Sequence, residues 1–187
     1  MKLSSSEPVL RPLIDRFLDY LRLVIDEGKI PHLAVRSSHR DAAVEVLERL
    51  RQLDFILRRL VQVEPRYRQA PNDNDAYLEA RTLTESFYYL AFRTRVVLQS
   101  LPSLDSFECV DIRDIRNHLI EHPEGKSSGI RTQSFGWGAE AAGPLVKPLR
   151  ATTETQQFGD KGLFINAAAF RDQLMPLLDR TLAKAGA

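Results

Sequence analysis

The chain has 187 residues, of which 43% are hydrophobic, so it is long enough to form one domain with its own core. Its 26 basic and 25 acidic residues leave a formal net charge of +1, which excludes a protein that holds long nucleic acids by bulk electrostatics alone. Cys109 is the only cysteine, which excludes a disulfide framework and a cysteine-rich zinc site. Because the sequence shows neither a signal-peptide core nor a membrane-spanning apolar run, we expect a cytoplasmic protein without a membrane partner.

Two amphipathic helices are predicted in the first third of the chain, over residues 8–27 and 38–65. We expect Ser38 and Asp41 to cap the start of the second helix and Pro65 to end it. In both segments apolar residues recur at steps of three and four, which is the spacing of one helical face. The first stripe comprises Val9, Leu10, Leu13, Ile14, Phe17, Leu18, Leu21, Val24 and Ile25, and the second comprises Ala43, Val46, Leu47, Leu50, Leu53, Ile56, Leu57, Leu60 and Val61.

A third and a fourth helix follow the polar turn at residues 71–75. The third should run to about Leu101, just before Pro102. The fourth, over residues 105–122, opens with Asp105 and Glu108 as a capping pair and ends at the residue before Pro123. The expected inward side chains are Leu83, Phe87, Leu90, Ala91, Val97 and Leu98 in the third helix, and Phe107, Ile112, Ile115 and Leu119 in the fourth.

Glycines, prolines and short alternating runs replace the helical pattern between residues 125 and 166. They predict three short strands, near residues 130–137, 145–151 and 163–165, in a small β insertion or ordered loop. A last helix follows, which is either capped by Asn166 and bent by Pro176 or begins only at that proline. Its expected inward residues are Phe170, Leu174, Leu177, Leu178 and Leu182. The sequence therefore predicts a single all-α domain over residues 1–187, a bundle of about five helices with a small antiparallel β insertion between the fourth and last helices.

The candidate chemistry is concentrated in residues 116–122, with the sequence RNHLIEH. Arg116, the polar Asn117 and, five residues later, His122 form a pattern that resembles the motif of HEPN domains. These are helical-bundle proteins, many of which are metal-independent ribonucleases that act as dimers. The resemblance covers this run and the bundle architecture. It implies an endoribonuclease that acts on RNA as a homodimer, without a cofactor, with Arg116, Asn117 and His122 as its catalytic residues.

These residue types suit the cleavage of a phosphodiester. The forked, permanently charged guanidinium of Arg116 would hold the phosphate and its developing charge. His122 would act as base on a ribose 2′-hydroxyl or as acid on the leaving oxygen, since an imidazole titrates near neutrality. Asn117 would orient either group, with His118, Glu121 and Arg113 as supporting residues. Because the six-residue separation places Arg116 and His122 roughly 120° apart around a helix, we expect a second copy to complete the site.

Two other functions stay open on the same residues. His118, Glu121 and His122 match the H-x-x-E-H spacing of inverzincin metalloproteases, in which two histidines on one helix face bind zinc beside a glutamate base. A zinc hydrolase with these three residues is one alternative to the metal-free site. The other is a non-catalytic helical module for dimerisation or binding of a protein partner. In that case the two histidines interact with the carbonyl end of the helix, and Arg116 pairs with a neighbouring acid.

Two further features bear on the surface of the bundle. The aromatic run at residues 87–92 is typical of a helix that supplies both the core and a dimer face. Arg58, Arg59, Arg66 and Arg68 form a basic patch near the end of the second helix. Such a patch is ordinarily a solvated face, and it would steer RNA if the protein is a nuclease.

Overall fold

The computed structural model describes residues 10–26, 35–69, 74–109, 112, 156–158, 163–165 and 167–185. Within these ranges the chain forms four long helices, which are α1 (Arg11–Ile25), α2 (Ser37–Gln69), α3 (Asn74–Leu98) and α5 (Ala167–Ala185). Two short strands, β1 (Gln156–Phe158) and β2 (Leu163–Ile165), pair antiparallel with Gln156 opposite Ile165. The predicted helical fold class is therefore confirmed.

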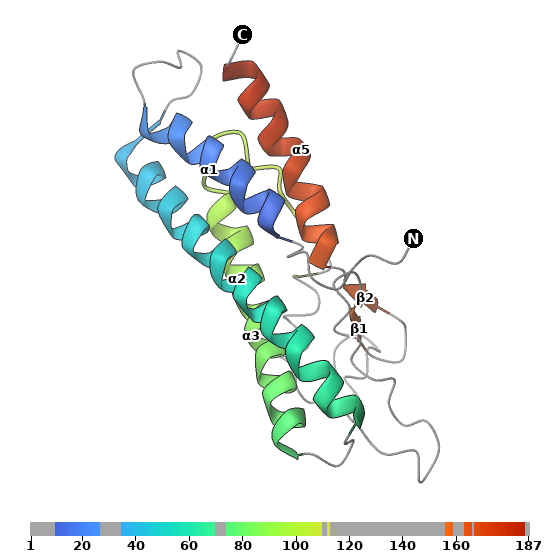
Figure 1. Ribbon diagram of the computed structural model, residues 1–187. Coiled ribbons are helices and arrows are strands. Elements are labelled where there is room, and N and C mark those ends of the chain that lie inside the picture. The colour runs from blue at the N-terminus through green and yellow to red at the C-terminus, as the bar shows by residue number, and fades with distance from the viewer. Residues whose placement is uncertain are drawn as a thin grey trace, which may run out of the picture.

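The helices pack in the order α3, α2, α1, α5 (Figure 1). Only residues 70–73 separate α2 from α3, and so short a connection makes the two helices antiparallel neighbours. The shorter α1 lies between α2 and α5 and contacts both. The last helix of the chain thus closes the bundle against the first.

The predicted apolar stripes form the core of the bundle. On α1 the exceptions are Ile25, which is 48% exposed, and Leu18, which is partly buried, while Tyr20 is fully buried without having been predicted. On α3, which ends at Leu98 instead of near Leu101, the additional buried residues are Ala76, Tyr88 and Thr94. The predicted residues of α3 that are only partly buried are Leu83, Leu90 and Val97. The predicted residues that are buried are Leu10, Leu13, Ile14, Phe17, Leu21, Val24, Ala43, Val46, Leu47, Leu50, Leu53, Ile56, Leu57, Leu60, Phe87, Ala91, Leu98, Phe107, Ile112, Phe170, Leu174, Leu177 and Leu178. Val9 and the side chain of Val61 lie outside the described part of the chain.

The start of α2 differs from the predicted cap. The helix begins at Ser37, so Ser38 and Asp41 both lie inside it. Arg36 precedes the helix, and its backbone N–H donates to Nδ1 of His39 over 3.1 Å. The backbone N–H of His39 in turn donates to the carbonyl of Arg36 over 2.9 Å. The prediction of Ser38 and Asp41 is wrong because a ring nitrogen of His39 accepts the hydrogen bond that the acid of a capping box would accept.

The end of α2 also differs, because the helix continues four residues past Pro65 to Gln69. Proline removes one helical hydrogen bond at a cost of about 3 kcal/mol, although its fixed φ is itself helical. Leu60 and Val63, in the turn before it, are each 1% exposed. Burial of two such side chains contributes about 1.5–3 kcal/mol each, which offsets the loss. Pro65 therefore does not end the helix as predicted.

The segment after α3 is a series of turns where the sequence predicts a helix from Asp105. Leu101, Leu104 and Phe107 recur every three residues, and all are at most 2% exposed. The N–H of Leu104 donates to Leu101 O, and that of Phe107 to Leu104 O. Ser103 has a φ of 64°, which no α-helix accommodates. The predicted start is wrong because this three-residue spacing buries its apolar residues in i to i+3 turns.

At the other end of the chain α5 begins at Ala167 and includes Pro176 in its interior, while Leu182 is only partly buried. Asn166, its predicted cap, lies outside the described residues, as do the strands predicted at 130–137 and 145–151 and helical positions 113–122. The strand predicted at Leu163–Ile165 coincides with β2. None of the helices within the described ranges combines the length and the hydropathy needed to cross a membrane.

Candidate functional site

The candidate site lies outside the described residues, the nearest of which precede it in the sequence. Ile112 is described, and its side chain is 1% exposed in the same core cluster that the four helices share. The RNHLIEH run begins four residues later. The candidate residues that lie outside the described ranges are Arg113, Arg116, Asn117, His118, Glu121 and His122.

A turn closed by a hydrogen bond lies at the last described positions before this run. Cys109 has a φ of 36° and is 1% exposed. Its carbonyl accepts a hydrogen bond from the N–H of Ile112 over 3.1 Å. A non-glycine residue with positive φ is costly, and it persists only where surrounding packing holds it. The buried side chains of Cys109 and Ile112 therefore anchor in the core the described residues that lie nearest to the candidate run in the sequence.

Side chains from α3, from the residue just after it and from α5 hold the preceding turns in place. Gln99 donates its amide N–H to the carbonyl of Phe107 over 2.9 Å, and Arg95 donates to the carbonyl of Glu108. The ring of Phe107 packs edge to face against Phe170 of α5, with centroids 5.1 Å apart. Contacts from both α3 and α5 therefore hold the described turns at residues 101–109 against the core.

Two buried phenols lie close to these turns. Tyr20 of α1 donates its hydroxyl to the carbonyl of Pro102 over 3.0 Å. Burial raises the pKa of Tyr20 far above its usual value. Burial likewise raises the pKa of Tyr88, and the adjacent Cys109 adds to the shift. Phenols that stay protonated at every physiological pH serve as structural hydrogen-bond donors and packing groups here, since neither can exchange a proton near neutrality.

The basic patch on α2 is paired with carboxylates. Arg59 and Arg66 both reach Glu79 of α3, over 2.7 and 3.1 Å. Arg58 lies 3.1 Å from Asp54, whose residue surface is only 6% exposed. Two arginines of α2 therefore share one carboxylate of α3, while the pair of Arg58 with Asp54 lies within α2. The Arg68 side chain is outside the described part of the structure. This arrangement favours a role in joining the two helices over a role in attracting phosphate.

The aromatic run of α3 is divided between core and surface. Phe87 and Tyr88 are at most 1% exposed, and their rings meet edge to face with centroids 5.4 Å apart. Tyr89, next in sequence, points outward and is 47% exposed. The expectation that this run supplies the core is confirmed for the first two residues. Its other part, a dimer face, stays a prediction.

Neither the metal-binding side chains of the described residues nor the comparisons with known proteins assign a function. The described part of the chain contains no group of three or more His, Cys, Asp or Glu side chains placed to hold a metal ion. The alternative zinc ligands, His118, Glu121 and His122, lie outside that part. No protein-family model matches the chain, and neither a curated protein nor a solved structure matches it. Any function must therefore be argued from the residues themselves.

Proposed function

We propose that this protein is a HEPN-like, metal-independent endoribonuclease that acts as a homodimer in the cytoplasm. Arg116 binds the scissile phosphate, Asn117 orients it, and His122 transfers the proton. The 2′-hydroxyl of the substrate attacks the phosphorus, which forms a 2′,3′-cyclic phosphate and releases a 5′-hydroxyl. His118, Glu121 and Arg113 support these groups.

The observation that carries this proposal is the helical bundle with the RNHLIEH run directly after its core. The helices α1, α2, α3 and α5 supply the architecture that the motif resemblance implies. The run begins only four residues after the buried Ile112 in the sequence, which supports a position close to that bundle. The proposal includes a fourth helix ending at His122, hence five helices in total, and a small antiparallel β insertion over residues 125–166.

The buried side chain of Ile112 provides a reference direction for Arg116 and His122 on such a helix. At 100° per residue, Arg116 would lie about 40° from the buried direction of Ile112, and His122 about 80° to its other side. Both groups would then flank the buried face from opposite sides. A single copy would hold them too far apart around the helix for one phosphate, which supports a site completed by a second copy.

Cleavage of a single-stranded RNA oligonucleotide in the presence of a chelator tests the proposal. We expect the wild-type protein to cut it and to leave a 2′,3′-cyclic phosphate end. Replacing His122→Ala or Arg116→Ala should each lower the rate by about 10²–10⁴-fold, the usual range for loss of a general acid–base or of a charge-stabilising group. His39→Gln, which changes a histidine far along the chain on α2, is the matched control and should leave the rate unchanged.

Substrate chemistry provides the second control. An oligonucleotide with a single 2′-deoxy sugar at the cleaved position should resist cleavage, because it lacks the attacking hydroxyl. Cleavage of that substrate would contradict the mechanism. Activity lost in chelator and restored by zinc would instead support a hydrolase built on His118, Glu121 and His122.

A non-catalytic interaction module is the second candidate, and one observation favours it. The arginines at 58, 59 and 66 are engaged with carboxylates, whereas the outer face of α3 carries exposed apolar side chains. A surface of that kind suits a protein partner better than RNA. Absence of any RNA cleavage, together with stable self-association, would favour this candidate.

A further inference from the structure

The outer face of α3 carries a line of apolar side chains that the bundle does not cover. Six large hydrophobic residues are exposed in the described ranges, and three of them belong to α3. Leu78 is 54% exposed, Tyr89 47% and Val96 44%. They are 11 and 7 residues apart, which is three and two helical turns to within about 20°. The three side chains therefore form one seam along the helix, on the side opposite the buried Ala91.

The seam has the spacing of a coiled-coil face. Between its apolar residues lie Thr82, Glu85 and Phe92, so the positions follow one another at steps of 4, 3, 4, 3 and 4. Thr82 is exposed, whereas Glu85 and Phe92 are partly buried. An alternation of three and four residues keeps one stripe facing a partner helix over several turns. The face is thus shaped for a second helix.

We propose that α3 is the interface through which two copies of this protein associate, with the two helices antiparallel. This inference goes beyond the ribonuclease proposal, because it names the contact surface and does not depend on catalysis. A two-fold axis at the level of Phe87 sets the register. Leu78 of one copy then lies level with Val96 of the other, and Thr82 lies level with Phe92. The two apolar ends of the seam cover each other.

The polar groups on the face fit the same register. Tyr89 of one copy lies level with Glu85 of the other, so its phenol O–H can donate to that carboxylate at two symmetric places. Polar groups therefore meet near the centre of the seam, while apolar groups meet at its two ends. This self-complementarity is what selects a second copy as the occupant, since an isologous interface requires one surface to match itself.

Sedimentation equilibrium of the full chain tests the surface. We expect the wild-type protein to form dimers. Tyr89→Glu should raise the dimer dissociation constant about 10- to 100-fold, because it sets two carboxylates against each other in the centre of the seam. Adding Glu85→Lys to that variant should restore association. Phe55→Glu is the matched control, since Phe55 is 60% exposed on the outer face of α2 and should leave the constant unchanged.

Disulfide cross-linking tests the register separately. Leu78 and Val96 are about 27 Å apart along one helix, beyond the reach of an intrachain disulfide. A chain carrying both Leu78→Cys and Val96→Cys should therefore form a covalent dimer on oxidation. Each single variant should not, because its cysteine lies equally far from its own symmetry mate. The native Cys109 is buried and is present in all three proteins.

The outcomes separate this proposal from the ribonuclease proposal. A monomeric wild-type protein, or a dimer unaffected by Tyr89→Glu, would overturn the α3 interface. Loss of the dimer in Phe55→Glu would assign the contact to α2 instead. Cross-linking of the single variants would reject the register. A circular dichroism spectrum with the helicity of the wild-type protein would show that each variant is folded. RNA cleavage by a protein that dimerises through another surface would leave the nuclease proposal intact.

Discussion

Tyr20 and Tyr88 show how single side chains tie the bundle together. Both rings are fully buried. The Tyr20 hydroxyl also donates a hydrogen bond to the carbonyl of Pro102, which joins α1 to the turns after α3. Because burial disfavours the charged phenolate, the pKa of each is higher in the folded chain than in the unfolded chain. Their contribution to stability is complete below about pH 10, the pKa of an unfolded tyrosine, and is lost as the pH rises above it.

The resulting prediction concerns alkaline unfolding. Above about pH 10 the free energy of unfolding should fall by about 1.4 kcal/mol per pH unit for each buried phenol. Tyr88→Phe should roughly halve this slope, since it leaves Tyr20 alone to contribute. Urea unfolding at a series of pH values measures it. A slope that is the same in Tyr88→Phe as in the wild-type protein would contradict the account.

At the scale of the element, the first turn of α2 provides a direct comparison between the predicted and the observed cap. His39→Ala removes the acceptor of the Arg36 N–H, so it should lower the free energy of unfolding by about 0.5–1.5 kcal/mol. Ser38→Ala changes an exposed residue within the turn and should cost less than about 0.5 kcal/mol. Urea denaturation of both variants measures the difference. A larger loss for Ser38→Ala would show that the serine is the true cap.

Element boundaries are where the sequence is least informative. The apolar stripes of the four helices predicted their inward faces, since periodic burial depends on the spacing of the residues alone. The error at Pro65 arose because the packing of α2 outweighs the helix-breaking effect of one proline. The error at Asp105 arose because Leu101, Leu104 and Phe107 are buried in turns instead of in a helix. Tertiary contacts decide both outcomes, and a local pattern does not contain them. The candidate site at Arg116, Asn117 and His122 rests on its motif alone, so it stays a prediction.

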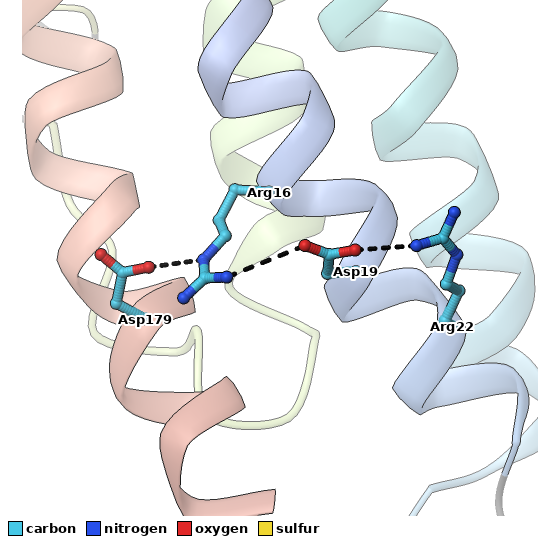
Figure 2. Close-up of polar contacts among 4 residues, drawn as sticks. All are labelled: Arg16, Asp19, Arg22 and Asp179. Carbon is cyan, nitrogen blue, oxygen red and sulfur yellow. Dashed lines mark hydrogen bonds and ion pairs between the residues drawn. The ribbon is translucent and has the colours of Figure 1, made fainter. Parts of the chain in front are cut away.

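At the scale of the whole molecule, the stability of the bundle depends on how α5 closes against α1. An ion pair joins them across 163 residues of sequence, with Arg16 Nε 2.5 Å from Asp179 Oδ1. Figure 2 shows that Arg16 also reaches Asp19, which in turn pairs with Arg22, so the charges form a chain along α1. Beneath this surface, Phe170 of α5 is 1% exposed and contacts Phe107.

The two kinds of contact should differ severalfold in strength. The side chains of Arg16 and Asp179 are 37% and 51% exposed, so water and salt screen their attraction. A double-mutant cycle with Arg16→Ala and Asp179→Ala should therefore give a coupling of only about 0.2–1 kcal/mol that falls with added salt. Phe170→Ala should cost about 3–5 kcal/mol, since it removes a buried ring and leaves a cavity against Phe107. Urea unfolding measures both. A coupling as large as the cost of Phe170→Ala would mean that charge, rather than apolar burial, docks the last helix on the first.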